Sequence, residues 1–128
     1  MAIIRSTGAF LGTSESSGDT IANNATDTGS EVDVLGDNTS IGEVELYLVF
    51  TSTVTAGTLD ITVNKRRVTG QAYAKINPQF QIAPINGQQL IPLGRMPAER
   101  FMQVSAKNNA TGASITGAFV GYTLFKGN

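Results

Sequence analysis

The chain has 128 residues and a formal net charge of −1, and only 15% of its residues are charged. This length favours a single domain with one core. His, Cys and Trp are absent, which excludes disulfides, Cys-ligated metals and the Ser-His-Asp triad. An enzyme would have to use carboxylates or lysine alone, so we expect no catalysis, no cofactor and no metal site.

No apolar run of seven or more residues occurs near the N-terminus, and no stretch approaches the roughly 20 apolar residues that span a bilayer. We therefore expect neither a signal peptide nor a membrane partner. The protein would be made and used on the cytosolic side, or released by lysis.

Residues 1–30 are predicted to form an extended N-terminal arm. Their second half is rich in Ser, Gly, Asn, Thr and Asp, which favour turns and irregular backbone. Two apolar pairs would anchor the arm on a neighbouring subunit, namely Ile3 with Ile4 and Phe10 with Leu11. A flexible terminus is the alternative.

Residues 31–128 are predicted to form the folded domain. Alternating apolar and polar residues mark strands at 31–35, 43–51 and 59–63, and the last two should form a hairpin through the turn at Ala56-Gly57. A weaker strand covers 70–76. Pro78, Pro84 and Pro92 then separate short extended pieces, which should lie at sheet edges or strand ends because proline lacks the ladder donor.

The strongest short-range signal lies near the C-terminus. Residues 101–107 and 114–125 both alternate, and the Asn/Gly-rich segment between them predicts a second hairpin. Gly117 and Gly121 indicate close approach of another backbone, from a neighbouring sheet or a second subunit. With about eight short strands and no convincing amphipathic helix, the pattern is that of an antiparallel β-sandwich or a small barrel.

The charges are segregated along the chain. Residues 1–60 carry nine acidic groups and one basic group, whereas residues 61–128 carry eight basic groups and one acidic group. If the halves interleave they neutralise each other; if they occupy opposite faces, the dipole could dock on a charged lattice. The basic residues proposed for docking are Lys65, Arg66, Arg67, Arg95 and Arg100. Arg100 could equally buttress the turn before the strand at Phe101.

Three groups of charged residues resemble sites. The first group is acidic and comprises Asp27, Glu31, Asp33 and Asp37. These residues lack the EF-hand spacing, so we expect them to form a solvent-exposed acidic edge rather than a Ca²⁺ site. Glu43, Glu45 and Asp60 would serve an enzyme only if they converged in a pocket. The run 65–67 could touch phosphates, but a pI near 5.2 and the lack of interleaved aromatic residues argue against a nucleic-acid partner.

Several short motifs occur in order along residues 31–128: Val32-Asp33-Val34-Leu35-Gly36, Leu46-Tyr47-Leu48-Val49, Ala56-Gly57-Thr58-Leu59, Ile91-Pro92-Leu93-Gly94 with Arg100-Phe101, and residues 111–119. Together they resemble the capsid cement (decoration) proteins of tailed bacteriophages, in particular the small jelly-roll type of podophage heads. The segment 65–86 and the arm depart from that pattern.

The resemblance implies a jelly-roll fold and a structural role on the outer capsid surface of a virion. Such a protein binds the major capsid protein, forms homo-oligomers (a dimer or trimer here) and stabilises the shell against the pressure of packaged DNA. The arm anchors and the basic residues would make the contacts.

Two alternatives remain open at this point. A carbohydrate-binding jelly roll on a virion surface would need an exposed aromatic platform, for which only Tyr47, Tyr73 and Tyr122 are available. A head–tail or tail-tube protein would expose a hydrophobic hairpin or helix, which the sequence does not indicate.

Overall fold

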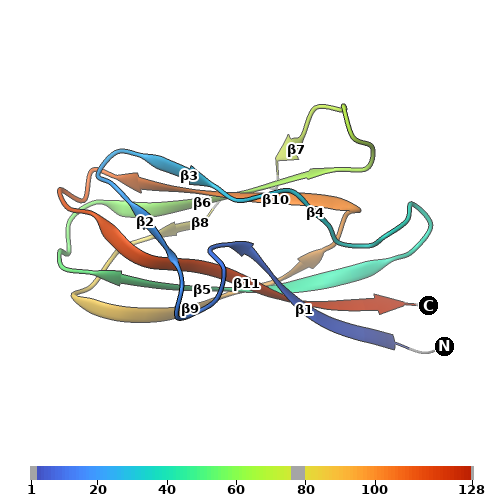
Figure 1. Ribbon diagram of the computed structural model, residues 1–128, viewed down its shortest axis with the longest axis horizontal. Coiled ribbons are helices and arrows are strands. Elements are labelled where there is room, and N and C mark those ends of the chain that lie inside the picture. Colours follow the sequence, from blue (N-terminus) through green and yellow to red (C-terminus); the bar gives the residue numbers. More distant parts are fainter. Residues whose placement is uncertain (1–2, 76–79, 128) are drawn as a thin grey trace.

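The computed structural model describes residues 3–75 and 80–127, which form strands and no helix. The strands follow one another along the chain (Figure 1) as β1 (Ile3–Leu11), β2 (Asp19–Ile21), β3 (Thr26–Thr28), β4 (Val32–Asp33), β5 (Gly42–Ser52), β6 (Thr58–Arg66), β7 (Ala74–Lys75), β8 (Phe80–Ile82), β9 (Gly87–Pro97), β10 (Phe101–Asn109) and β11 (Ile115–Gly127). Within these ranges no helix is available that could cross a membrane.

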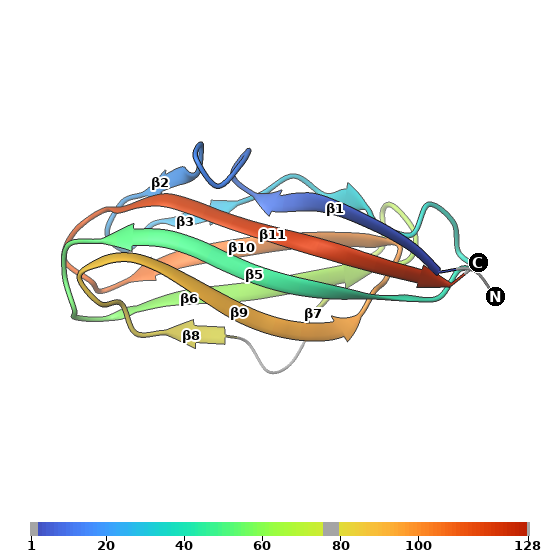
Figure 2. The same cartoon turned by 90° about the horizontal axis from the view of Figure 1, so that it is seen from below.

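The strands form two antiparallel sheets that pack face to face (Figure 2). The first sheet has the order β1-β11-β5-β9, and β2 also pairs with β11. The second has the order β3-β10-β6-β7, with β4 beside β10 and β8 beside β6. The protein is therefore an antiparallel β-sandwich of the jelly-roll type, as the sequence predicted.

The core lies between the sheets and is supplied by alternate residues of the long strands. In β5 every second side chain is buried, namely Val44, Leu46, Leu48 and Phe50. The facing strands of the second sheet contribute Leu59, Ile61, Val63, Met102, Val104 and Ala106. Burying a Val, Leu or Phe side chain in full stabilises a fold by about 1.5–3 kcal/mol, so this alternation dictates which face of each strand turns inward.

The two connections predicted to be hairpins instead cross between the sheets. β5 and β6 belong to different sheets, and so do β10 and β11. β5 pairs with β11 and β9, while β6 pairs with β10. Both hairpin predictions are therefore wrong. Alternation shows only that each strand buries one face, and a short connection can span the ~10 Å between packed sheets as well as the ~4.8 Å between paired strands.

The predicted N-terminal arm is part of the sandwich. β1 pairs antiparallel with β11 in a register that runs from Ile3 opposite Gly127 to Leu11 opposite Val120, with a bulge near its end. β2 and β3 extend the edges of the two sheets. The division into an arm at 1–30 and a domain at 31–128 is therefore wrong for the described residues 3–30. They supply edge strands, and the side chains of Phe10, Leu11 and Ile21 enter the core of the same chain.

β9 lies at the edge of the first sheet, as its prolines predicted. Pro92 lies opposite Tyr47, beside a bulge at which β9 has one extra residue, Leu93. Prolines and bulges at an edge hinder pairing with another chain, because they interrupt the row of free backbone donors. Pro78, the first proline of the predicted series, lies outside the described residues.

The close approach predicted at Gly121 comes from a side chain rather than from another backbone. A Cβ at this position would lie 2.5 Å from the ring of Tyr47 on the neighbouring β5. Gly8 on β1 has the same arrangement, because its Cβ would lie 2.5 Å from the hydroxyl of Tyr122 on β11. Each glycine lets an aromatic ring from the paired strand lie flat on the sheet.

Candidate interaction surface

Two of the four predicted apolar anchors, Phe10 and Leu11, are buried in the core rather than exposed on an arm. Phe10 and Leu11 are 2% and 1% exposed, and the Phe10 ring stacks on Tyr122 with the ring centroids 4.3 Å apart. Ile3 and Ile4 lie in the same strand, at the end of the sandwich that holds both termini. Phe10 and Leu11 therefore cannot reach a neighbouring subunit while the fold is intact, and the arm interpretation is corrected.

Arg66, at the end of β6, is held by Glu31. Its Nε and Nη2 atoms donate to the two carboxylate oxygens of Glu31 over 2.7 and 3.0 Å, and its guanidinium lies 4.6 Å from the ring centroid of Tyr73. The Tyr73 hydroxyl donates to the same carboxylate. Arg66 first, and Tyr73 second, hold the pKa of Glu31 below its usual value. The Arg66 side chain is thus part of the fold rather than a free docking group.

Arg100 and Lys65 are engaged in the same region. The Nε and Nη2 atoms of Arg100 each lie 3.3 Å from a carboxylate oxygen of Asp33, and the guanidinium stacks over the Phe101 ring at 4.9 Å. These contacts agree with the buttressing role considered for Arg100. The Lys65 amine donates to the carbonyl oxygen of Pro97, and burial lowers the pKa of this amine.

Arg67 and Arg95 are the most exposed members of the predicted basic group. Arg67 lies 3.1 Å from Glu99 and Arg95 lies 3.4 Å from Glu45, and the two arginine side chains are 68% and 54% exposed. Exposed ion pairs contribute only about 0–1 kcal/mol, so either arginine can leave its partner at little cost. These two remain candidates for contact with another protein.

The charges of the two halves of the chain interleave. Of the five ion pairs found among the described residues, four join an acidic residue of the first half to a basic residue of the second half: Glu31–Arg66, Asp33–Arg100, Asp37–Lys126 and Glu45–Arg95. The sandwich brings these residues together because its sheets mix early and late strands. Of the two arrangements considered from the sequence, mutual neutralisation is the one observed.

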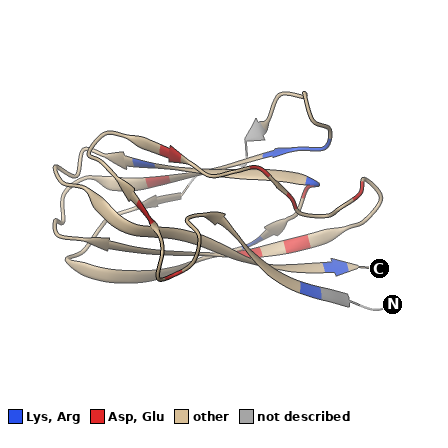
Figure 3. Ribbon diagram, viewed as in Figure 1, with Lys and Arg blue, Asp and Glu red and all other residues tan. Residues whose placement is uncertain are grey.

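The loops at the opposite end of the sandwich contain no charged residue. Four loops meet there, and none contains Asp, Glu, Lys or Arg: 22–25, 53–57, 83–86 and 110–114. In Figure 3 these loops are tan, without blue or red segments, whereas most of the charged residues lie toward the end that holds both termini. We call the four loops the uncharged end. Sequence reasoning missed it, because each loop is unremarkable alone and only the topology brings them together.

A buried polar network holds the uncharged end in shape. The Asn108 side chain is fully buried and donates to the carbonyl oxygens of Ile21 and Ala113 over 2.9 and 2.8 Å. The Asn24 side chain accepts a hydrogen bond from the amide of Ala110 at 3.0 Å, and both of these residues have left-handed backbones. Loops fixed in this way lose little conformational entropy when another surface covers them.

Two large exposed apolar side chains lie in or next to the uncharged end, Ile85 in the loop 83–86 and Leu90 in β9. Ile85 is 58% exposed and Leu90 is 68% exposed, and the Ile85 amide donates to the Gln89 side chain at 2.7 Å. Leu90 lies opposite Val49 on the outer face of the first sheet. Two further exposed apolar residues, Ile41 and Val68, belong to loops at the charged end.

The acidic residues considered for Ca²⁺ do not come together. Glu31 and Asp33 bind arginines, whereas Asp37 accepts hydrogen bonds from the amide and hydroxyl of Ser40, which lower its pKa to about 2. Asp27 faces Asp19 of β2 instead. Across residues 3–75 and 80–127, no three His, Cys, Asp or Glu side chains are grouped to hold a metal ion.

Glu43, Glu45 and Asp60 do not share a pocket. Glu43 and Glu45 lie on the outer face of the first sheet, while Asp60 lies on β6 of the second sheet. Asp60 accepts hydrogen bonds from Thr58 and Asn109 there. The convergence that carboxylate catalysis would need is therefore not formed by these three residues.

None of the three tyrosines forms an exposed platform. Tyr122 stacks on Phe10 and Tyr73 lies against Arg66. Tyr47 is half-buried over β11, with its ring 5.8 Å from that of Phe119. The aromatic surface that the carbohydrate-binding alternative requires is therefore absent at these positions.

No protein-family model matches the chain, and no curated protein matches it in sequence. Solved structures share its fold. A chain of infectious bursal disease virus, Gx strain, has a TM-score of 0.55 and 14% identity over 99% of this chain and 32% of that one. A chain of the T13 particle of the same virus has a TM-score of 0.53 and 12% identity, over 97% of this chain and 39% of that one.

A chain from Bacillus endospore appendages, described as disulfide-linked pili, has a TM-score of 0.48 and 11% identity over 98% of this chain and 89% of that one. This chain spans less than half of the two viral chains. At identities of 12–14%, the likeness to the two viral chains concerns the fold alone.

Proposed function

We propose that this protein is a structural component of a virion that binds the outer surface of a tailed-phage capsid, associates there with further copies of itself and stabilises the shell. Its partners would be the major capsid protein and itself, and it would reach the capsid surface after synthesis in the host cytoplasm. The order of motifs along residues 31–128 and the sandwich fold support this proposal.

The observation that carries the proposal is the difference between the two ends of the sandwich. One end holds the ion pairs found among the described residues, whereas the loops of the other end are uncharged, are held by hydrogen bonds and present the exposed Ile85 beside Leu90 of β9. The cores of protein interfaces are depleted in charged residues, and exposed apolar groups mark interaction sites. We therefore assign docking to the uncharged end, with Arg67 and Arg95 as additional contacts.

A weak contact of this kind becomes effective on a lattice. A shell presents many identical sites, so copies that touch the capsid and one another gain avidity without a strong single contact. The proposal includes no nucleic-acid partner, because the arginines Arg66, Arg67, Arg95 and Arg100 all have carboxylate partners.

Co-sedimentation with expanded phage capsids that lack their decoration protein tests the proposal. We expect saturable binding at a fixed ratio to capsid subunits. Ile85→Glu combined with Leu90→Glu should weaken binding at least about tenfold, because a desolvated carboxylate at an interface is costly. The matched control is Ile41→Glu, an even more exposed apolar position at the charged end, which should bind as the wild type does.

Salt dependence separates the two candidate surfaces. Docking through uncharged loops should change little with ionic strength, whereas docking through Arg67 and Arg95 should weaken steeply as salt is added. Absence of saturable binding at any salt concentration would refute the capsid proposal. Equal loss in the Ile41→Glu control would refute the assignment to the uncharged end.

A further inference from the structure

Two carboxyl groups face each other between the sheets, at the edge where β2 and β3 lie. Asp19 of β2 lies opposite Ala118 of β11 in the first sheet, and Asp27 of β3 lies opposite Ala106 of β10 in the second. Both alanines are fully buried, so both carboxyls lie on the inner faces of their sheets. Strands β2 and β3 contact each other, and Asp19 is the neighbouring group that acts most strongly on the Asp27 carboxyl, so the two groups lie together between the sheets.

This arrangement lacks a donor unless a proton is present. The Oδ2 atom of Asp27 is buried and has no hydrogen-bond partner among the described residues. A carboxylate at Asp19 can only accept, so two ionised groups would repel each other. A proton on one of the carboxyls supplies the missing donor and makes a carboxyl–carboxylate hydrogen bond, which is among the stronger types.

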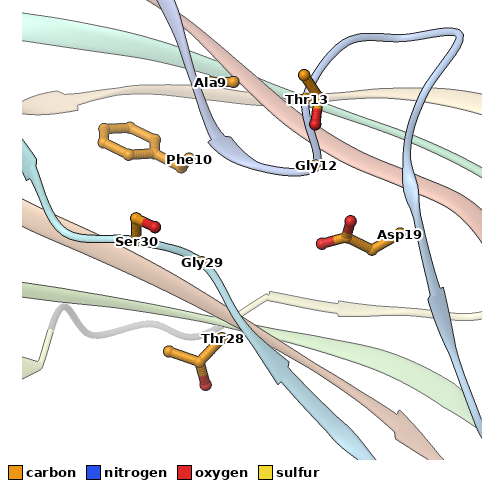
Figure 4. A pocket seen from close by; sticks show the side chains of 8 residues that line it. All are labelled: Ala9, Phe10, Gly12, Thr13, Asp19, Thr28, Gly29 and Ser30. Carbon is orange, nitrogen blue, oxygen red and sulfur yellow. The ribbon is translucent and has the colours of Figure 1, made fainter.

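Among the described residues, no cation lies beside the pair to replace that proton. Phe10 of β1 lines the hollow next to Asp19, and Ala118 of β11 and Ala106 of β10 lie opposite the two carboxyls. The adjacent Lys107 of β10 is exposed on the opposite face of its sheet. Beside Asp19 opens a hollow of about 260 Å³, lined by side chains and backbone of β1, the following loop and residues 28–30 (Figure 4).

The pKa of the Asp27 carboxyl is therefore raised above its ordinary range. The hydrogen bond with Asp19, then burial and the negative charge of Asp19, raise the pKa of Asp27 to about 6 from an ordinary value of 3.8. Because the folded pKa is raised, the stabilisation is complete at low pH and is lost as the pH rises toward and through about 6.

We infer that the Asp19–Asp27 pair is a pH-sensitive latch between the two sheets, closed while the carboxyls share one proton and weakened once both are ionised. This inference does not rest on the proposed function. Its consequence is local, because opening the latch would release the edge formed by residues 12–30 while the paired strands β5, β11, β6 and β10 stay closed.

Asp27→Asn tests the latch, because an asparagine amide donates to Asp19 at every pH and mimics the protonated state. Urea unfolding of the full chain, followed by circular dichroism, gives an unfolding equilibrium constant for each protein. The ratio of the wild-type constant to the Asp27→Asn constant should rise about 30-fold between about pH 4.5 and about pH 8. Asp19→Asn, which replaces the other carboxyl of the pair, should remove the same pH dependence. Glu43→Gln, which removes an exposed carboxylate, should leave it unchanged.

Hydrogen exchange read by mass spectrometry places the effect in the chain, since variants compared at one pH share the same intrinsic exchange rates. At about pH 8, residues 12–30 should exchange faster in the wild type than in Asp27→Asn, and residues 58–66 should not differ. Identical pH profiles for the wild type and both asparagine variants would overturn the inference. Stabilisation by Ca²⁺ or Mg²⁺ at pH 8 that Asp27→Asn abolishes would also overturn it, because the pair would then be a cation site.

Discussion

Replacing Phe10 by alanine tests whether the N-terminal strand belongs to the core. The Phe10 side chain is 2% exposed and stacks on Tyr122 at 4.3 Å. Truncating a buried phenylalanine costs about 3–5 kcal/mol, of which the aromatic stack supplies about 0.5–1.5 kcal/mol. The total stability of a domain is about 5–15 kcal/mol, so this single change should remove a large part of it.

Urea unfolding followed by circular dichroism measures this loss, and a thermal scan should show a fall in Tm of about 10–20 °C for a domain of this size. Ile41→Ala is the matched control, because Ile41 is 81% exposed and should change stability by less than about 0.5 kcal/mol. If Phe10→Ala were as stable as that control, Phe10 would not be a core residue and the arm interpretation would stand.

Two further predictions concern the uncharged end. Gly57 and Gly112 both have left-handed backbones (φ 69° and 86°), but only a Cβ at Gly57 would overlap the carbonyl oxygen of Asn109. Gly57→Ala should therefore lower the free energy of unfolding by about 2–4 kcal/mol, and Gly112→Ala by only about 1–2 kcal/mol. Equal losses in urea unfolding would contradict the close approach of these loops. Asn108→Ala should cost about 1–3 kcal/mol, because it leaves buried carbonyls without donors. The exposed Asn38→Ala serves as its control, and a loss no larger than in that variant would show that the buried network contributes nothing.

Alternation of residue types was sufficient to predict the long strands β5, β6, β10 and β11 and the buried face of β5. The stretch 43–51 was predicted to turn Val44, Leu46, Leu48 and Phe50 to one side, and these four residues are buried in β5. Alternation could not predict pairing, because it says that a strand has an inner face but not which sheet it joins. Both hairpin predictions failed for this reason.

The N-terminal strand escaped prediction because its partner fills its apolar positions. β1 has Gly8 where a buried strand would normally show a large side chain, and the ring of Tyr122 on β11 occupies that space. From the sequence alone, the stretch between Ile4 and Phe10 therefore shows too few apolar residues for a strand.

The arrangement of the charges in space also could not be predicted from the sequence. The acidic and basic halves are plain in the linear order, but Glu31 meets Arg66 and Asp33 meets Arg100 only because β4 and β6 lie on either side of β10. The same topology gathers four neutral loops at the far end. A linear charge pattern thus predicts a docking surface only after the strand order is known.

The crossing connections have a consequence for how the chain folds. Neither β5–β6 nor β10–β11 closes as a local hairpin, so the first sheet needs β1 to meet β11, from Ile3 opposite Gly127 onward. Contacts between segments so distant in sequence cost loop-closure entropy before they contribute any stabilising free energy. Sandwiches dominated by such contacts fold in about milliseconds to seconds. During synthesis β1 must wait, unpaired, until β11 leaves the ribosome, and its free edges are exposed to aggregation throughout that interval.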